Sequence, residues 1–304
     1  MLTLRALSSG VEHCIDIARV RGAKPLVPTT IMYLGAHTSI AGSFDKCLDR
    51  ISDLGGNCLM TFASSPRSLT TKDLPQKTID IYLAKKNKLN IGPHFFHGVY
   101  LINLASEKKS YLKVSIDSLI FYQQLAGAIG GVGTIFHIGS HKGLGLPEVI
   151  DQVVQAINEV LDNTPKGTRL FLENAAGAAG TIGSTFEELA GIMARIGDKS
   201  KIGICLDTQH AWASGYTLDT VLAKFDQVIG LKYLRVIHLN DSKTDFESHV
   251  DRHENLGKGK IGKDALQAFI NDKRLANIPF ILEVPGRGEG PTKSDLDSLK
   301  KMIL

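Results

Sequence analysis

The segment VDRHENLGKGKIG, residues 250–262, places an aspartate and a histidine two positions apart, just after an apolar run. If the segment is extended, Asp251 and His253 point to the same side, while Arg252 between them points elsewhere. A carboxylate and an imidazole on one side are a suitable pair of metal ligands. The segment therefore indicates half of a metal site, which other parts of the chain must complete.

Histidines and carboxylates also gather at the ends of the other apolar runs. Of the ten histidines, only His13 lies in the first 31 residues; the other nine lie at strand ends or in the loops that follow, and none lies in a predicted helix. The residues with ligand chemistry at these places are His37, His94, His97, His137, His141, Glu173, Asp207, His210, His238, Asp251, His253 and Glu283. Any one such histidine is more often an ordinary hydrogen-bonded residue. A group of buried carboxylates is costly without cations, so the cluster indicates a metal centre.

The donor set limits which metals fit. Imidazole and carboxylate without thiolate favour zinc, manganese or iron. The ligands outnumber what one tetrahedral ion uses. With three or four protein ligands per zinc, the cluster holds two or three ions if one carboxylate bridges.

Three glycine-rich stretches lie beside these residues: HIGSHKGLG, ENAAGAAGTIG and LGKGKIG. Their backbone amides are accessible to phosphates if the loops are open. The same stretches also serve as plain connections, and the sequence leaves both possibilities open.

From Tyr33 onward the chain alternates short apolar runs with stretches of helical spacing. The predicted strands cover residues 33–37, 57–62, 90–95, 133–138, 169–174, 202–207, 233–240 and 279–284. Helical patterns follow them over residues 43–55, 69–89, 106–130, 145–162, 184–197, 216–230, 262–275 and 292–304. Continuous Val, Ile and Leu runs are typical of parallel strands that are buried on both faces.

Eight such units in about 270 residues predict a single α/β domain, a (β/α)8 TIM barrel. An open doubly wound sheet is the alternative. In a TIM barrel the active site lies at the carboxyl ends of the strands, so the histidines and carboxylates are expected to meet on one rim.

Size and composition agree with a soluble globular protein. The chain has 304 residues, 43% hydrophobic content and a formal net charge of +4. No apolar run reaches the roughly 18 residues that span a membrane, and the mild charge permits a nucleic-acid partner without arguing for one. Cys58 and Cys205 lie in apolar runs and are predicted core residues, and the cysteines form no C-x-x-C pair. We therefore expect a reducing, cytoplasmic setting.

Residues 1–31 differ from the rest because they show no clean amphipathic period. No apolar segment precedes a small-residue cleavage site, which argues against a secretory signal. Glu12 and Asp16 count against a transit peptide. We expect residues 1–31 to be an extension outside the domain, either disordered or upstream of a true start at Met32, and residues 32–304 to form the barrel.

With these residues in view, the chain resembles the endonuclease IV family of apurinic/apyrimidinic DNA endonucleases. The resemblance rests on YLGAHTSIAG, HGVYLINL, FHIGSHKG, LENAAG, CLDTQHAWASGY, HLNDSK, DRHENLGKGKIG and ILEVPG, in that order. It implies a TIM barrel with three zinc ions that cuts the phosphodiester on the 5′ side of an abasic site, leaving a 3′-hydroxyl and a 5′-deoxyribose phosphate. It also implies double-stranded DNA as the partner and a monomeric enzyme.

The resemblance distributes nine residues over the three zinc ions. The first ion is expected to bind His97, His137 and Glu173. The second shares Glu173 and adds Asp207, His238 and Glu283. The third is expected to bind His210, Asp251 and His253.

These assignments suggest a hydrolytic mechanism. Zinc lowers the pKa of bound water toward 7, and we expect the two ions that Glu173 joins to hold the attacking hydroxide. Glu283 is then expected to orient the hydroxide or to accept its proton. His37 and His141 are expected to fix ligands rather than to bind metal.

The resemblance also implies that Arg67, Tyr100 and Leu101 enter the DNA stack and help to flip the abasic nucleotide out. Arg252 is expected to face solvent or a DNA phosphate, and Lys258 and Lys260 either extend that contact or lie in a solvated loop. The chain departs from the family pattern at positions that are not expected metal ligands: Ser64, Ser65, Ile138, Ala175, Ala178 and Gln209.

Two other functions fit parts of the pattern. A sugar isomerase or epimerase on the same barrel also uses carboxylates and histidines around one or two divalent ions. Such an enzyme has no need of Asp251 with His253, or of Tyr100 with Leu101. A protein that binds damaged DNA without cutting it has no need to keep costly metal carboxylates.

Overall fold

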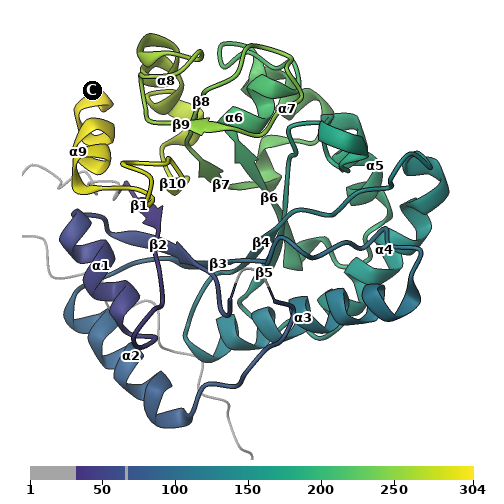
Figure 1. Cartoon of the computed structure of the whole chain (residues 1–304), viewed down its shortest axis with the longest axis horizontal. Coiled ribbons are helices and arrows are strands. Elements are labelled where there is room, and N and C mark those ends of the chain that lie inside the picture. The colour runs from purple at the N-terminus through teal and green to yellow at the C-terminus, as the bar shows by residue number, and fades with distance from the viewer. Residues whose placement is uncertain (1–31, 66–67) are drawn as a thin grey trace, which may run out of the picture. The chain divides into compact units, whose positions relative to one another are not determined.

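Eight parallel strands close into a barrel at the centre of the molecule (Figure 1). Around the barrel the neighbouring strands are β1, β10, β7, β6, β5, β4, β3 and β2, and β2 closes the ring against β1. Their bounds are β1 Leu34–His37, β2 Cys58–Thr61, β3 His94–His97, β4 Gly133–Phe136, β5 Arg169–Glu173, β6 Ile202–Asp207, β7 Leu234–His238 and β10 Phe280–Leu282. The predicted TIM barrel is confirmed, and the open doubly wound sheet is wrong.

The computed structural model describes residues 32–65 and 68–304. The predictions for residues 1–31 and for Arg67 concern positions outside these ranges. Within the ranges, no helix combines the length and the apolar character that a membrane crossing requires.

The register of the strands brings their carboxyl ends to one rim. Asp207 at the end of β6 pairs with His238 at the end of β7. Glu173 at the end of β5 pairs with Cys205, two residues before the end of β6. Because parallel strands all point the same way, their last side chains gather at the same end of the barrel.

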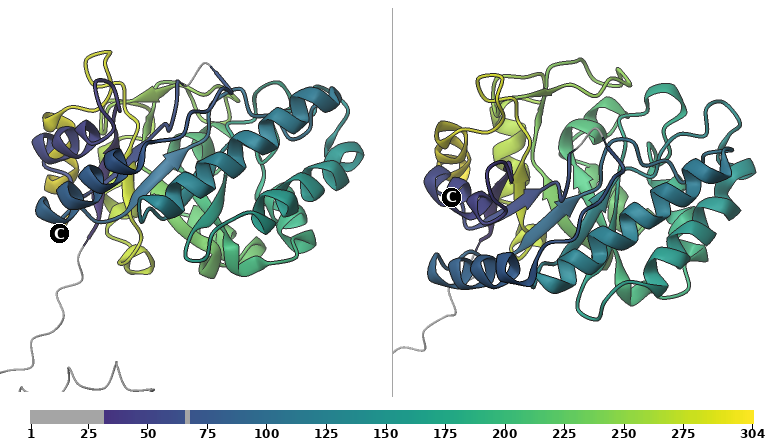
Figure 2. Two further views of the ribbon diagram at one scale, coloured as in Figure 1. Left: turned by 90° about the horizontal axis from the view of Figure 1, so that it is seen from below. Right: turned by 60° about the horizontal axis from the view of Figure 1, so that its bottom comes forward.

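Eight helices, which follow the barrel strands along the chain, lie around the outside of the barrel (Figure 1), and Figure 2 shows them from two other sides. They are α1 Lys46–Leu54, α2 Gln76–Lys88, α3 Lys109–Ala128, α4 Leu146–Asp162, α5 Phe186–Arg195, α7 Val221–Val228, α8 Lys263–Ile270 and α9 Lys293–Met302. In α4 the buried residues Val149, Val153, Ile157 and Val160 recur at three- and four-residue steps. Such a stripe packs one face of the helix inward and leaves the other to solvent.

Side chains of the strands also fill the inside of the barrel. The buried cluster there contains Cys58, Met60, Phe95, Ile135, Phe171, Cys205, Val236 and Ile281. The prediction that Cys58 and Cys205 are core residues is confirmed. Burial raises the pKa of the Cys205 thiol to about 12, so the side chain stays neutral.

The third strand begins later than predicted. The backbone amides of Asn90 and Ile91 still donate to carbonyls at the end of α2, at 3.1 Å each. Extended structure therefore starts only at His94. The predicted strand over residues 90–95 was four residues early, and His97 lies at the end of the strand rather than in the loop after it.

Three short elements were not predicted. A short helix, α6 (Thr208–Ala213), follows β6 directly, and β8 (Asp241–Ser242) pairs antiparallel with β9 (His253–Glu254). His210 lies in α6, so the expectation that no histidine lies in a helix was wrong. The carboxylate of Asp207 accepts the His210 amide at 2.8 Å and caps the helix.

Candidate metal centre

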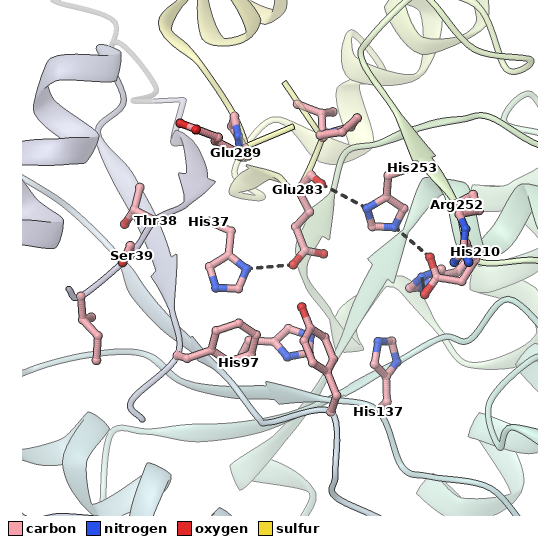
Figure 3. A pocket seen from close by; sticks show the side chains of 18 of the residues that line it. His37, Thr38, Ser39, His97, His137, His210, Arg252, His253, Glu283 and Glu289 are labelled. Atoms are coloured by element: carbon pink, nitrogen blue, oxygen red, sulfur yellow. Dashed lines mark hydrogen bonds and ion pairs between the residues drawn. The ribbon is translucent and has the colours of Figure 1, made fainter. Parts of the chain in front are cut away.

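The predicted ligands converge at the carboxyl rim of the barrel. A cavity of about 740 Å³ opens there, and His37, His97, His137, His210, Asp251, His253 and Glu283 line it (Figure 3). Glu173, Asp207 and His238 are fully buried. The nine residues come from six of the barrel strands and the segments that follow those strands, which explains why they are scattered along the sequence.

The first group consists of His97, His137 and Glu173, whose ligand atoms all lie within 4.8 Å of one another. One carboxylate oxygen, Glu173 Oε2, lies 3.0 Å from His97 Nε2 and 3.5 Å from His137 Nε2. The end of β3, the residue after β4 and the end of β5 supply the three side chains.

The second group consists of Glu173, Asp207, His238 and Glu283, again within 4.8 Å. His238 Nδ1 lies 2.8 Å from Glu173 Oε1 and 3.0 Å from Glu283 Oε2. Glu173 thus directs one oxygen to each of the first two groups, which is the geometry of a bridging carboxylate.

The third group lies on the open side of the cavity. Asp251 approaches both imidazoles, with Oδ2 3.4 Å from His210 Nε2 and Oδ1 3.5 Å from His253 Nε2. The structure also brings Asp207 Oδ2 to 3.7 Å from His253 Nε2. Asp207 therefore lies between the second and third groups, a position that the sequence did not indicate.

Three of the imidazoles are oriented in the same way. In each, the Nδ1–H group donates to a backbone carbonyl: His97 to Gly98 at 2.7 Å, His210 to Asn174 at 3.0 Å, and His253 to Glu283 at 3.2 Å. Each Nε2 atom then carries the lone pair and faces a carboxylate. Two acceptors that face each other need a cation between them, either a proton or a metal ion.

The Nε2 atoms of His210 and His253 are buried and have no hydrogen-bond partner among the described residues. A buried acceptor without a donor is costly. A divalent cation bound by these nitrogens and the nearby carboxylates removes that cost, so the donor set fits a metal centre.

The electrostatics of the centre favour added positive charge. Burial alone raises the pKa of Glu173, but the nearby imidazoles of His137, His238 and His97 hold it well below its ordinary value. Burial alone lowers the pKa of His210, but Asp207, Asp251 and Glu173 raise it to about 10. The carboxylates thus stay ionised and draw protons or metal ions to the imidazoles.

Two asparagines that the sequence did not single out hold the carboxylates in place. Asn240 donates from Nδ2 to Asp207 Oδ2 at 2.6 Å and accepts the Glu283 amide at 2.9 Å. Asn174 Oδ1 accepts the Asp207 amide at 2.7 Å. In the sequence, only their positions in the motifs LENAAG and HLNDSK, close to the ligands Glu173 and His238, could have indicated this role.

Three other histidines of the candidate set have different surroundings. His37 donates from Nδ1 to Glu283 Oε1 at 3.2 Å, as expected for a residue that fixes a ligand. His141 Nδ1 instead accepts the amides of Gly143 and Gly145, at 3.2 and 3.1 Å, and so stabilises the loop after β4. His94 is buried between Thr61 and Tyr82 and serves the core.

Tyr100 and Leu101 are exposed at the rim, with 67% and 39% of their surface accessible. Tyr100 lines the main cavity and also a second one of about 660 Å³, whose wall includes Leu101, Ala175 and Ala178. Arg252 is exposed as well, and its guanidinium donates to the carbonyl of Asp251 at 2.8 Å.

The glycine-rich stretch at residues 256–262 wraps around a buried carboxylate. Asp241 accepts backbone amides from Gly259 at 2.9 Å, Ile261 at 3.0 Å and Gly262 at 3.3 Å. These amides therefore do not face a phosphate, and this stretch acts as a structured connection. Lys260 lies 3.1 Å from Asp245, on the outer side of the same loop.

Comparison with known proteins identifies relatives of the chain. Residues 44–302 match the family described as a Xylose isomerase-like TIM barrel. A protein of Halothermothrix orenii named Probable endonuclease 4 is 40% identical over 260 residues, which cover 84% of this chain and 94% of that protein. The crystal structure of endonuclease IV from Thermus thermophilus matches with a TM-score of 0.78 and 31% identity, over 89% of this chain and 97% of that one. A D-tagatose 3-epimerase-like protein shares the fold alone, with a TM-score of 0.69 and 19% identity over 89% of this chain and 97% of that one.

Proposed function

Because this chain belongs to the endonuclease IV family of DNA-repair nucleases, we propose that it hydrolyses the phosphodiester on the 5′ side of abasic sites in double-stranded DNA. The proposed products are a 3′-hydroxyl and a 5′-deoxyribose phosphate. The observation that carries the proposal is the set of Nε2 atoms at His97, His210 and His253 that face carboxylates across the cavity.

We propose three zinc ions, held by the nine residues of the three groups. Bound zinc supplies a coordinated water with a lowered pKa and a Lewis acid for the phosphate. Glu173 fixes the spacing of the first two groups because its two oxygens face one group each. A third group with its own Asp251 and His253 is the feature that a sugar enzyme with one or two ions does not need.

Glu283 is the proposed residue for orienting the attacking water or taking its proton. It lines the cavity, and His37 donates a hydrogen bond to one of its oxygens at 3.2 Å. Burial alone raises its pKa, but His238, His37 and His97 hold the pKa well below the ordinary value, so the carboxylate stays ionised and can orient a water through a hydrogen bond. As the water oxygen bonds to phosphorus, it loses a proton and the bond from phosphorus to the 3′-oxygen breaks; the leaving 3′-oxygen takes up a proton from solvent and becomes the 3′-hydroxyl.

Contacts with DNA are proposed for Tyr100, Leu101, Arg252 and Arg67. The exposure of Tyr100 and Leu101 beside the cavity suits side chains that wedge into a base stack. The ring of Phe62 meets Tyr100 edge-on with centroids 5.3 Å apart, which supports the tyrosine from below. We also propose that the enzyme acts as a monomer in the cytoplasm.

The direct test is incision of a duplex that carries one abasic analogue, without added magnesium, together with elemental analysis of the protein. We expect one cut on the 5′ side of the analogue and about three zinc ions per chain. An intact duplex and a zinc content near zero would contradict the proposal. Ketohexoses incubated in parallel test the sugar epimerase, which predicts sugar interconversion and uncut DNA.

A variant with a matched control tests the role of Glu283. Glu283→Gln keeps the shape of the side chain but removes the base, so we expect intact DNA binding and a roughly 10²–10⁴-fold slower incision. Glu289→Gln is the control, because Glu289 lines the same cavity but belongs to none of the ligand groups. Near-native incision by Glu283→Gln would remove this residue from the mechanism.

A further inference from the structure

We infer that Gln209 is a positioning residue for the third group of ligands, His210, Asp251 and His253, and that it sets the cation affinity of that group alone. The inference rests on the proposed function, because it takes this group to be a cation site. Within the described residues, Gln209 makes no hydrogen bond to any of the nine ligand side chains; its partners are Ser242 and Val250.

The side chain of Gln209 connects two ligands through their neighbours. Gln209 immediately precedes His210 in α6 and is fully buried. Its Nε2 atom donates to the carbonyl of Val250 at 3.0 Å, and Val250 immediately precedes Asp251. The same nitrogen lies 3.3 Å from the hydroxyl of Ser242 in β8. One amide group thus fixes the distance between the backbone at His210 and the backbone at Asp251.

Further hydrogen bonds hold the same loop against α6. Trp212 Nε1 donates to the Thr244 carbonyl at 3.2 Å. The amides of Glu247 and His249 donate to the carbonyls of Trp212 and Ala213, at 3.1 and 3.0 Å. Glu247 and His249 adopt positive φ values of 57° and 55°, which side chains other than glycine seldom adopt. The docking onto α6 maintains this strained path, and the path delivers Asp251 to the cavity.

The N–H donor of Gln209, rather than the volume of its side chain, explains why a glutamine suits this position. Its Oε1 atom is buried and has no hydrogen-bond partner among the described residues. An unsatisfied buried acceptor is costly, and an apolar side chain of similar size avoids that cost. The N–H donor to Val250 is therefore the feature that a glutamine provides here and a methionine does not.

Only the third group depends on this loop. The first two groups draw their ligands from barrel strands or from the residues next to them, so the sheet fixes their positions. Asp251 lies outside any strand, and 55% of its side chain is exposed. Loss of the Gln209 donor should therefore weaken the third site and leave the other two unchanged.

The test compares zinc affinities in Gln209→Met and Gln123→Met by competition with a chromogenic chelator. Gln123 is a matched control: it is fully buried, it donates from Nε2 to the Arg169 carbonyl at 3.1 Å, and its Oε1 also has no partner in the described part of the chain. It lies on α3, at the strand end opposite to the ligands. In Gln209→Met we expect one of the zinc ions to bind with roughly 10-fold weaker affinity, as for other residues that orient ligands. Gln123→Met should bind all its zinc like the natural protein.

Trp212→Phe provides a second, milder variant because it removes the indole donor to Thr244 and keeps the ring. A smaller loss of affinity for the same single ion supports the inference, even if Gln209→Met does not fold. Unchanged zinc affinities in both variants overturn it. Absence of zinc from the natural protein refutes the proposed metal sites before any variant is made. Three zinc ions without DNA incision refute only the proposed reaction, and the affinities still decide the role of Gln209.

Discussion

At the scale of single residues, the decisive feature is the direction in which each imidazole points its lone pair. His97, His210 and His253 each use Nδ1–H on a backbone carbonyl. This fixes the tautomer, so Nε2 remains free for a cation. A side-chain carboxylate at Nδ1 would have added charge to the ligand, whereas a carbonyl only orients it.

Glu173 is the residue whose loss should disturb most of the centre. It is fully buried and faces both of the first two groups. Glu173→Gln removes the negative charge and replaces one ligand oxygen with an amide group that binds zinc poorly. We expect elemental analysis to find about one of the three proposed zinc ions. Full zinc content in Glu173→Gln would contradict the bridging role.

Asn240 should matter through the ligands that it orients. Asn240→Leu keeps the size of the side chain but loses the hydrogen bonds to Asp207 and Glu283, so we expect roughly 10- to 100-fold weaker zinc binding. Chelator competition measures the change. Asn271→Leu is the control, because Asn271 uses its amide on Gln267, Met302 and Leu304 far along the chain from the ligands. Equal zinc affinities in the two variants would show that Asn240 does not orient ligands.

Residue types at strand ends could be predicted from the sequence, but their partners could not. Apolar runs show where strands stop, and the nine candidate ligands stand at or after those stops. The approach of Asp207 to His253 depends on the path of a loop between β8 and β9. No local sequence pattern encodes that path. His141 also follows a strand end, as the ligands do, but its Nδ1 atom accepts the amide of Gly143 in its own loop.

At the scale of elements, α6 combines two tasks within six residues. It carries His210 toward the cavity and docks the loop that carries Asp251. A helix this short has too few turns for a periodic signal, so the sequence did not reveal it. Its start is set by the Asp207 cap, and its end is covered by amides of the loop. Helices such as α4 were predictable because they bury a full apolar stripe, whereas α2 buries only Ile79 and Tyr82 and begins seven residues later than predicted.

Gly259 gives an element-scale prediction about the loop around Asp241. A Cβ atom at Gly259 would lie 2.3 Å from the Ser242 carbonyl oxygen and 2.5 Å from Asp241 Oδ1, so the loop must shift. We expect Gly259→Ala to lower the free energy of unfolding by about 1–3 kcal/mol, as for other overpacked sites. Denaturant unfolding measures the change.

Gly191→Ala is the matched control for this prediction. Gly191 lies inside α5, and a Cβ there meets nothing closer than 3.9 Å. Alanine in an open helical position stabilises by about 0.5–1 kcal/mol, so the two variants should shift the unfolding midpoint in opposite directions. A Gly259→Ala protein as stable as the natural one would show that the loop yields easily.

At the scale of the whole molecule, the barrel accounts for how distant segments form one centre. The closed sheet was predictable because eight runs, each buried on both faces, alternate with helices. The boundary of β3 was not, because Asn90 and Ile91 bond to the end of α2 and delay the strand. The register of the closed barrel decides which strand ends lie next to each other. This register cannot be read from the sequence of any single segment.

The metal centre should contribute to the stability of the whole barrel. Glu173 and Asp207 are fully buried carboxyl side chains, and zinc binds only where folding has assembled its ligands. We expect removal of zinc by a chelator to lower the melting temperature by roughly 5–10 °C, the range for about 2–3 kcal/mol in a protein of this size. Calorimetry before and after re-addition of zinc measures this. An unchanged melting temperature in protein shown to be zinc-free would contradict it.

The carboxylate of Asp241 acts as a resident anion for the loop at residues 257–262. It occupies the backbone amides of Gly259, Ile261 and Gly262 in the free protein. Loops that are shaped by an incoming anion lose binding free energy to the entropy of becoming ordered. This loop reaches its final form when the chain folds. A molecule that binds to the outer surface of this loop therefore meets a loop that is already ordered. Its binding free energy is not reduced by the entropy cost of ordering the loop.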